Sequence, residues 1–163
     1  MNNFKIGRIR KNHQNLLELC FHHRELLTYR TLPDLFSHSM RIKELLQQQI
    51  EQKMTMSFSI ENDDEIAGVA LFHNLDFEER QGQLSVLLLA KFESNKLENL
   101  LGWMIEHSFN TLNMHRIYGL VRVDKIEFVP IIEKCGFSRE AHLSHAAFFN
   151  GEYGDMYQYS IVK

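Results

Sequence analysis

Hydrophobic and polar residues alternate with a period of two through the middle of the chain. In "MSFSI", residues 56–60, Met56, Phe58 and Ile60 alternate with two serines, which predicts a half-buried strand. The segments "IAGVALFHNL" (66–75) and "QLSVLLLA" (83–90) predict two further strands. The second is almost continuously apolar, which is typical of a central strand that is covered on both faces.

Elsewhere the apolar residues recur at helical spacing. This pattern predicts three helices, over residues 15–27, 33–52 and 97–112. A shorter helix is predicted within "KIEFVPIIEKCGF", residues 125–137. Pro130 limits its regular part to a turn or two, and Gly136 provides a left-handed cap at its end.

More strands are predicted near both ends of the chain and after the third helix. They cover residues 4–10, 115–123, 141–149 and 156–162. Asn150 and Gly151 form a turn signal between the last two, which predicts a closing hairpin. The resulting order is β-αα-βββ-α-β-α-ββ, and we expect one mixed α/β (α+β) domain over residues 1–163.

Composition and charge exclude several classes of function. The formal net charge of −3 gives no support for nucleic-acid binding. The N-terminal segment lacks the apolar run of a signal peptide, and no apolar run approaches the length of a membrane span. Cys20 and Cys135 form neither a disulfide framework nor a zinc pattern. His142 and His145 fall on opposite faces of a strand. We therefore expect a cytoplasmic protein that binds no metal, membrane or nucleic acid.

Four phrases carry a family resemblance. They are "HNLDFEERQGQLSVLL" (73–88), "LNMHRIYGLV" (112–121), "IIEKCGF" (131–137) and "AHLSHAAFFNGEYGDMYQYSIV" (141–162). In this order they resemble the GCN5-related N-acetyltransferases (GNAT), most closely the RimJ/RimL-like branch that acetylates the N-termini of ribosomal proteins. The resemblance covers nearly the whole chain. It implies a mostly antiparallel seven-stranded sheet whose fourth and fifth strands splay apart.

The resemblance also implies a co-substrate, acetyl-CoA, in the gap between those two strands. Its pantetheine arm would pair with the backbone edge at Leu87, Leu88 and Leu89. Its pyrophosphate would lie on the backbone N–H groups at the start of the following helix, at Ser94, Asn95 and Lys96. An amine would then attack the thioester directly, and the protein would supply proximity and polarisation of the carbonyl group.

The phosphate loop departs from the pattern of that family. Its glycine positions fall on Glu93 and Asn95, and its arginine position falls on Phe92. Asn95 and Glu98 fit a capping box, which would satisfy the same N–H groups that a pyrophosphate uses. Glu93 also adds negative charge where an anion would lie. We interpret the segment as a degenerate pyrophosphate loop.

Other positions of the family's active centre have changed as well. Gln83 stands where many members have a glutamate that acts, through water, as a general base, and an amide cannot take that proton. Lys125 stands where the family has an asparagine that contacts the cofactor arm. Phe128 replaces a small residue near the path of the cofactor.

The resemblance and the residue chemistry together suggest two catalytic groups besides Gln83. His73, at the end of a strand, is the best remaining base because its unperturbed pKa suits proton transfer. A partly buried structural histidine is the alternative. Ser85 is placed to donate to a carbonyl oxygen, although buried serines often bond the backbone instead. Tyr29 and Arg30 resemble the family's substrate-groove loop, and ordinary packing is the alternative for both.

Three functions therefore remain open. The favoured one is an N-acetyltransferase that uses acetyl-CoA to modify a primary amine, either a peptide N-terminus or a small amine. The second is a binding or regulatory module that keeps the fold but no longer uses acetyl-CoA. The third is an acyltransferase with a carrier-bound or altered donor that does not need the pyrophosphate site. A fold alone does not decide among them, and we expect a monomer or a homodimer.

Overall fold

The structure is a computed structural model that describes residues 4–8, 27–29, 56–62, 65–89, 96–149 and 151–163. Its strands are β1 (Phe4–Arg8), β2 (Leu27–Tyr29), β3 (Met56–Asn62), β4 (Glu65–Asp76), β5 (Gln81–Leu89), β6 (Arg116–Arg122), β7 (Ser138–Phe149) and β8 (Glu152–Val162). Its helices are α3 (Leu97–Glu106), the π-helix η4 (His107–Thr111), the 3-10 helix η5 (Val123–Phe128) and α4 (Val129–Lys134).

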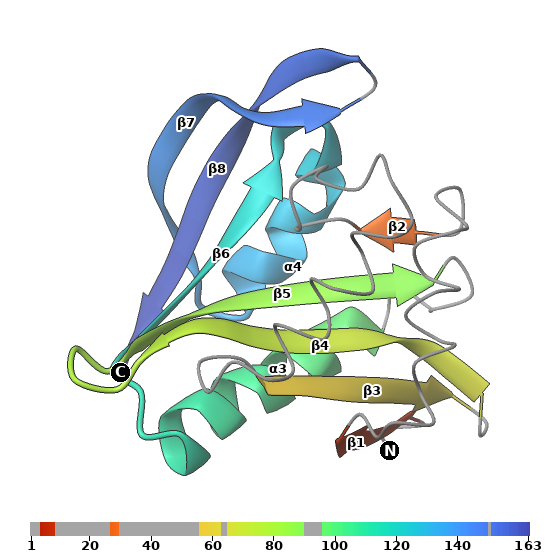
Figure 1. Ribbon diagram of the computed structural model, residues 1–163, viewed down its shortest axis with the longest axis vertical. Helices are drawn as coiled ribbons and strands as arrows, with labels where there is room; N and C mark the ends of the chain where they lie inside the picture. The colour runs from red at the N-terminus through yellow and green to blue at the C-terminus, as the bar shows by residue number, and fades with distance from the viewer. Residues whose placement is uncertain (1–3, 9–26, 30–55, 63–64, 90–95, 150) are drawn as a thin grey trace, which may run out of the picture.

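The strands form one sheet (Figure 1). Seven of them run in the order β1-β3-β4-β5-β6-β8-β7, and the short β2 pairs with β5 off this path. Within the described part of the chain, β5 and β6 are the single parallel pair. The prediction of a mixed, mostly antiparallel sheet of seven strands is confirmed for this path. The strand β2 was not expected, because its first residue, Leu27, ends the first predicted helix.

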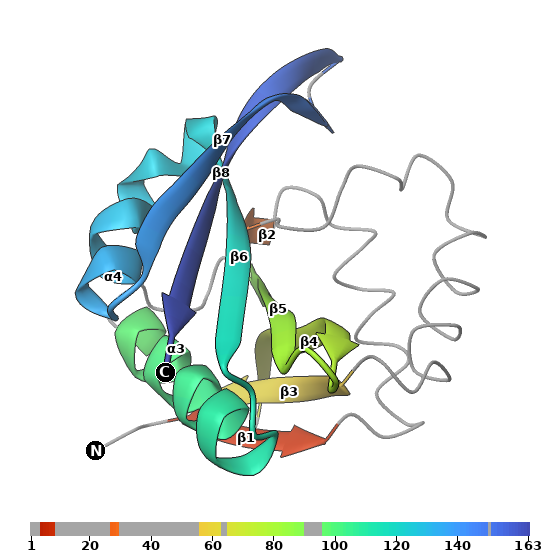
Figure 2. The same ribbon diagram turned by 90° about the vertical axis from the view of Figure 1, so that its left-hand side faces the viewer.

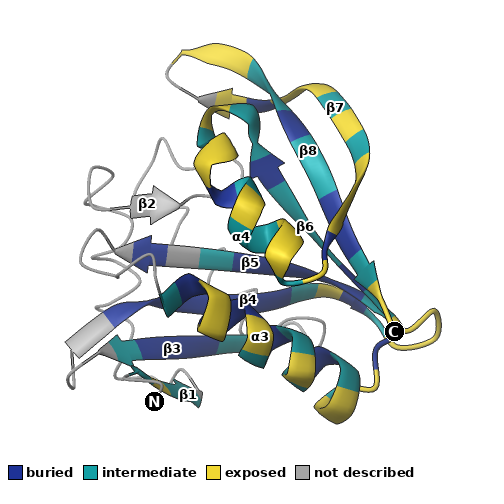
Figure 3. Cartoon of the chain, turned by 180° about the vertical axis from the view of Figure 1, so that it is seen from behind, coloured by how far each residue is buried: buried dark blue, intermediate teal, exposed yellow. Residues whose placement is uncertain are grey.

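The described helices cover one face of the sheet (Figure 2). Helix α3 buries its apolar side, made up of Leu97, Leu100, Leu101 and Met104. These side chains pack with Phe58, Phe72 and Leu84 of the sheet in one core cluster. Full burial of such a side chain stabilises the fold by about 1.5–3 kcal/mol. Figure 3 shows the buried stretches along β3, β4 and β5 behind α3.

The ends of two elements agree with their sequence signals. Gly136 has a φ of 95°, and the N–H groups of Gly136 and Phe137 bond to the carbonyls of Glu133 and Ile132. This is the hydrogen-bond pattern of a left-handed helix cap. At the hairpin, Phe149 pairs with Glu152, and Gly151 has a φ of 87°. Both turns therefore form where the sequence predicts them.

Most of the first two expected helices, over residues 15–27 and 33–52, lies outside the described residues. The third, expected over 97–112, is a regular helix only as far as Glu106 and continues as the wider η4. Within the ranges that the structure describes, no helix has both the length and the apolar character needed to cross a membrane.

Candidate functional site

The candidate site lies where β5 and β6 separate. Gln81, Gly82 and Gln83 pair with the first residues of β6, and the two strands diverge beyond this point (Figures 1 and 2). The predicted splay is therefore confirmed. Because β4 takes the opposite edge of β5, the divergence leaves a stretch of backbone edge facing the gap.

The open stretch of this edge is short. Strand β2 pairs with Leu88 and Leu89 on the β6 side of β5. Among the described strands, none pairs with residues 84–87 on that side. The edge that the resemblance implied for a pantetheine arm, at Leu87, Leu88 and Leu89, is thus partly taken by β2. The open edge begins three residues earlier, at Leu84.

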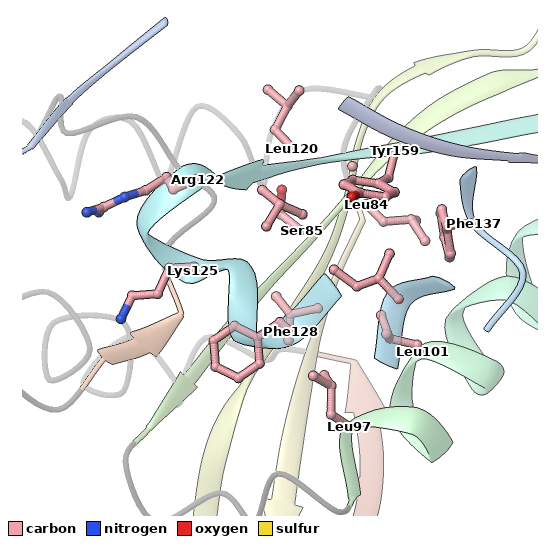
Figure 4. A pocket seen from close by; sticks show the side chains of 14 residues that line it. Leu84, Ser85, Leu97, Leu101, Leu120, Arg122, Lys125, Phe128, Phe137 and Tyr159 are labelled. Atoms are coloured by element: carbon pink, nitrogen blue, oxygen red, sulfur yellow. The ribbon is translucent and has the colours of Figure 1, made fainter. Parts of the chain in front are cut away.

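A cavity of about 90 Å³ fills the gap between the two strands (Figure 4). Its lining consists of Leu84, Ser85 and Val86 from β5, Gly119, Leu120, Val121 and Arg122 from β6, Leu97 and Leu101 from α3, and Lys125, Phe128, Ile132, Phe137 and Tyr159. Most of these side chains are apolar. Such a lining suits a thioester and its alkyl neighbours better than a charged group.

Gly119, a glycine on β6, leaves room in the gap between β5 and β6, which is called the slot from here on. A Cβ atom added at Gly119 would lie 3.5 Å from the carbonyl oxygen of Leu84, which is an ordinary contact distance. A longer side chain at this position would extend into the cavity that Gly119 lines. Position 119 therefore controls the width of the slot without straining the backbone.

Two polar pairs join β4 to β5 close to the point of divergence. The Nε2 atom of His73 lies 2.7 Å from the Oγ atom of Ser85. The Nδ2 atom of Asn74 donates to Oε1 of Gln83 over 2.9 Å. Gln83 and Ser85 are both buried polar residues, with 6% and 2% of their surface exposed. The three sequence-predicted catalytic candidates therefore lie together in the fold, and Asn74, which sequence reasoning missed, contacts one of them, Gln83.

The protonation of His73 differs from the sequence expectation. Burial lowers the pKa of His73 from 6.5 to about 4, because an apolar environment disfavours the charged imidazolium. The imidazole is therefore neutral at pH 7. The ordinary pKa on which the sequence argument for a general base relied is not kept in the fold, so the ring orients Ser85 more readily than it takes a proton.

The region after β6 brings two of the expected residues into the slot. Lys125 and Phe128 both line the cavity, and Phe128 is buried. The expectation that a bulky group replaces a small one beside the slot is consistent with this placement. In Figure 4 the charged ends of Arg122 and Lys125 point away from the apolar end of the cavity, where Leu101 and Phe137 lie.

Arg122 itself was missed by sequence reasoning. It makes a two-bond contact with Asp124, from Nε to Oδ1 over 2.8 Å and from its terminal nitrogen to Oδ2 over 2.7 Å. The signal in the sequence is an arginine at the end of a strand, two residues before an acidic residue. By itself that pattern does not separate a site residue from a solvated ion pair.

The start of α3 differs from the predicted capping box. The N-cap is Lys96, and no side chain caps it by a hydrogen bond. Glu98, the expected partner of Asn95, instead forms an ion pair with Nζ of Lys134 over 2.7 Å. Ser94 and Asn95 lie outside the described residues, as does the rest of the loop over 90–95.

The remaining candidates can be placed only in part. The backbone of Tyr29 belongs to β2, opposite Leu88, and Arg30 lies outside the described residues. Within the described ranges, no group of three or more histidine, cysteine or acidic residues is arranged to hold a metal ion. His142 instead contacts Asp155, with 2.6 Å between Nε2 and Oδ2.

Known proteins share this fold and sequence pattern. The family described as "Acetyltransferase (GNAT) domain" matches residues 14–158. Spermidine N(1)-acetyltransferase from Vibrio cholerae is 25% identical over 124 residues, which is 75% of this chain and 72% of that protein. The enzyme of the same name from Escherichia coli is 24% identical over 115 residues, 70% of this chain and 62% of that protein.

A solved structure shows the same arrangement of elements. The spermidine N-acetyltransferase from Vibrio cholerae, in complex with CoA and spermine, superposes with a TM-score of 0.86 at 20% identity. The superposition covers 99% of this chain and 96% of that one. At this level of identity the likeness establishes the fold, and the chemistry has to be argued from the site.

Proposed function

Because the chain belongs to the GNAT acetyltransferase family, we propose that it transfers an acetyl group from acetyl-CoA to a primary amine of a small aliphatic molecule. One observation carries the proposal. Strands β5 and β6 part after Gln83 and Tyr118, and the gap holds an apolar cavity that reaches Ser85. A thioester arm that enters this gap has room for its acetyl group beside the buried polar pairs.

The residues present fit the acyl end of this co-substrate. The backbone edge over residues 84–87 offers peptide groups to the amides of a pantetheine arm, and the apolar lining offers contact to its methylene groups. Lys125 lines the same cavity and contributes a positive charge near a phosphate-bearing ligand. When bound, acetyl-CoA supplies an activated acyl group with a good leaving group.

The reaction is a direct transfer. The amine nitrogen, in its neutral form, forms a bond to the carbonyl carbon, and the carbon–sulfur bond then breaks. The amine loses one proton and the departing sulfur gains one, so the products are an amide and a free thiol. Holding the two reactants together supplies most of the rate that the protein needs to provide.

The pair of His73 and Ser85 orients a hydroxyl at the edge of the slot. Ser85 lines the cavity, and the neutral imidazole of His73 fixes the direction of its hydroxyl group. This hydroxyl is placed to guide a proton between the amine and the sulfur. With a pKa of about 4, His73 does not remove a proton from an alkylammonium ion, so the amine has to bind after losing its proton to water.

The relatives favour a small amine over a peptide as the acceptor. The matching enzymes from Vibrio cholerae and Escherichia coli are named for spermidine. The sequence resemblance to the RimJ/RimL-like branch points instead to a peptide N-terminus. We propose a small aliphatic amine, with a polyamine as the first candidate, and a cytoplasmic location.

One observation favours a second function, a module that keeps the fold without using acetyl-CoA. Strand β2 pairs with Leu88 and Leu89 on the edge that a cofactor arm would use, and the bulky Phe128 lines the cavity between β5 and β6. The glycine-free loop before α3 points in the same direction. Such a module would bind its partner without chemistry.

Two measurements separate these functions. Thermal unfolding is followed with and without acetyl-CoA at about 100 times its dissociation constant, which adds about 2.7 kcal/mol and raises the Tm by roughly 5–10 °C. Mass spectrometry then follows acetylation of spermidine and of a peptide with a free N-terminus. A shift with acetylated spermidine supports the proposal. No shift at millimolar acetyl-CoA supports the module. Acetylation of the peptide but not of spermidine would mean that the acceptor is a peptide N-terminus and not a small amine.

A further inference from the structure

A β-bulge on β4 presents Asn74 to the neighbouring strand. Asn74 has a φ of 51°, and the register between β4 and β5 shifts between His73 and Asp76. Asparagine is one of the few residues with a side chain that tolerates this left-handed conformation. Bulges of this kind redirect single side chains and occur often beside active sites.

Packing on the other side of the strand fixes the bulge in place. Leu75 is almost completely buried, and it lies directly over Gly82. A Cβ atom at Gly82 would come within 2.7 Å of Cδ2 of Leu75, so any larger residue at position 82 would force the Leu75 side chain to move. The buried Leu75 side chain therefore anchors the chain directly after Asn74 in the core.

The hydrogen bond from Asn74 determines how the amide of Gln83 is oriented. Asn74 donates from Nδ2 to Oε1 of Gln83, which occupies the acceptor end of that amide. The Nε2 atom of Gln83 is consequently turned away from β4. Among the residues that the structure describes, no hydrogen-bond partner is found for this Nε2 atom. Gln83 is nevertheless 94% buried, and a buried donor without a partner is costly.

The position of Gln83 in β5 places this donor close to the cavity. Gln83 is the last residue of β5 that pairs with β6, and the next two residues, Leu84 and Ser85, line the cavity. On the other edge of β5, Gln83 is paired with β4 through His73. Gln83 is not itself among the lining residues, but Ser85, two residues along β5 and so on the same face of the sheet, lines the cavity. An amide turned away from β4 therefore lies next to the point at which β5 and β6 diverge.

We propose that Asn74 is a positioning residue that holds Gln83 Nε2 as the hydrogen-bond donor to the acetyl carbonyl oxygen. This inference rests on the proposed acetyl transfer. As the amine nitrogen bonds to the carbonyl carbon, the carbonyl π electrons move onto the oxygen, which becomes negatively charged. The Nε2–H group of Gln83 stabilises this charge without giving up its proton. The electrons return when the carbon–sulfur bond breaks.

This role explains why an amide can replace a carboxylate at position 83. A carboxylate would accept the hydrogen bond from Asn74 equally well but would have no proton to offer to the developing oxyanion. Preorganised donors act strongly at such sites because they are already oriented in a poorly solvated environment. Gln83 is thus a catalytic residue by this inference, and Asn74 acts only through it.

A double-mutant cycle tests the inference. Asn74→Gly keeps the left-handed backbone accessible and removes only the side chain, and Gln83→Met keeps the size of the side chain but removes the donor. Removal of one oxyanion donor costs about 10²–10³-fold in kcat. We therefore expect Gln83→Met to lower kcat by about 10²-fold and Asn74→Gly by about 10-fold, with the KM for the amine changed less than about twofold. Melting temperatures verify that each variant is folded.

The decisive comparison is Asn74→Gly in the background of Gln83→Met. If Asn74 acts through Gln83, this second substitution has no further effect on kcat. An equal loss in both backgrounds, or unchanged kcat for Asn74→Gly alone, overturns the inference and leaves the acetyl transfer standing. An absence of turnover by the wild-type protein, with no thermal shift by acetyl-CoA, overturns the proposed function and this inference together.

Discussion

The Nε2 atom of His73 and the Oγ atom of Ser85 lie 2.7 Å apart across the pair formed by β4 and β5. Ser85 is 2% exposed, so its hydroxyl and the ring nitrogen satisfy each other where water has little access. The Cα partner of Ser85 is Leu71, and that of His73 is Gln83, so the contact runs diagonally across the two strands. The contact connects Ser85, in the wall of the slot, to the C-terminal part of β4. Loss of either side chain therefore leaves the polar group of the other without this partner.

Removal of the hydroxyl should therefore cost stability through His73. In Ser85→Ala the partly buried imidazole of His73 loses its partner, and an unsatisfied buried polar group costs about 1–3 kcal/mol. We expect a decrease of that size in the free energy of unfolding, measured by urea denaturation at pH 7. In the background of His73→Leu, where no ring nitrogen is left unpaired, Ser85→Ala should cost less than about 1 kcal/mol. Equal losses in the two backgrounds would show that the contact contributes nothing.

Stability should also depend on pH through His73. Burial lowers the pKa of His73 to about 4 in the folded protein, from 6.5. Between these two values the unfolded chain binds a proton that the folded protein excludes, so the free energy of unfolding falls as the pH falls. The contribution of the neutral ring is fully present above pH 6.5 and is lost as the pH approaches about 4.

The size of the effect can be measured against a matched variant. Between pH 7 and pH 4.5 the wild type should lose about 2–3 kcal/mol more of its unfolding free energy than His73→Leu does. The other histidines are present in both proteins, so their contributions cancel in the difference. If the difference in the free energy of unfolding between the two proteins is the same at pH 7 and at pH 4.5, the lowered pKa of His73 is contradicted.

The slot between β5 and β6 can be tested by filling it from one side. A Cβ atom at Gly119 makes only an ordinary contact with Leu84, so Gly119→Ala should preserve the acetyl-CoA thermal shift of roughly 5–10 °C. Gly119→Leu places three more carbon atoms in the cavity and should abolish the shift. Circular dichroism without ligand verifies that both variants are folded. A normal shift in Gly119→Leu would place the ligand elsewhere.

The sequence predicted the architecture better than it predicted the chemistry. Alternation in 56–60 and the apolar run in 83–90 identify β3 and β5, because the side-chain period of a half-buried or central strand is written directly in the residues. Glycine signals at Gly136 and Gly151 identified two turns for the same local reason. The splay of β5 and β6 came from the family resemblance, since no pattern within either strand encodes how far apart the two lie.

The site depends on contacts between distant segments, and these limited its prediction. The pKa of His73 is set by burial, which its own neighbours in the sequence do not determine. The contact of Asn74 with Gln83 was overlooked because it depends on both a bulge on β4 and an amide on β5. Strand β2 has three residues and no alternation from which to recognise it. Tertiary context decided each of these features.

The pairing of β2 with β5 leads to a last prediction, on whether β2 and acetyl-CoA compete for the same edge of β5. Leu27 and Tyr29 pair with Leu89 and Leu88, on the edge that a pantetheine arm would extend along from residues 84–87. If β2 competes with the arm, weakening its ladder should increase the affinity for acetyl-CoA, because the binding-competent state becomes more populated. Proline at position 28 is incompatible with regular strand pairing.

We therefore expect Thr28→Pro to lower the dissociation constant of acetyl-CoA, as measured by isothermal titration calorimetry. Loss of one backbone hydrogen bond, worth about 0.5–1.5 kcal/mol, corresponds to a factor of roughly 2–10. Thr28→Val, which keeps a β-branched residue suited to a strand, should bind like the wild type. Weaker binding by Thr28→Pro would instead mean that β2 forms part of the ligand site, so β2 would be a wall of the slot and not a competitor for it.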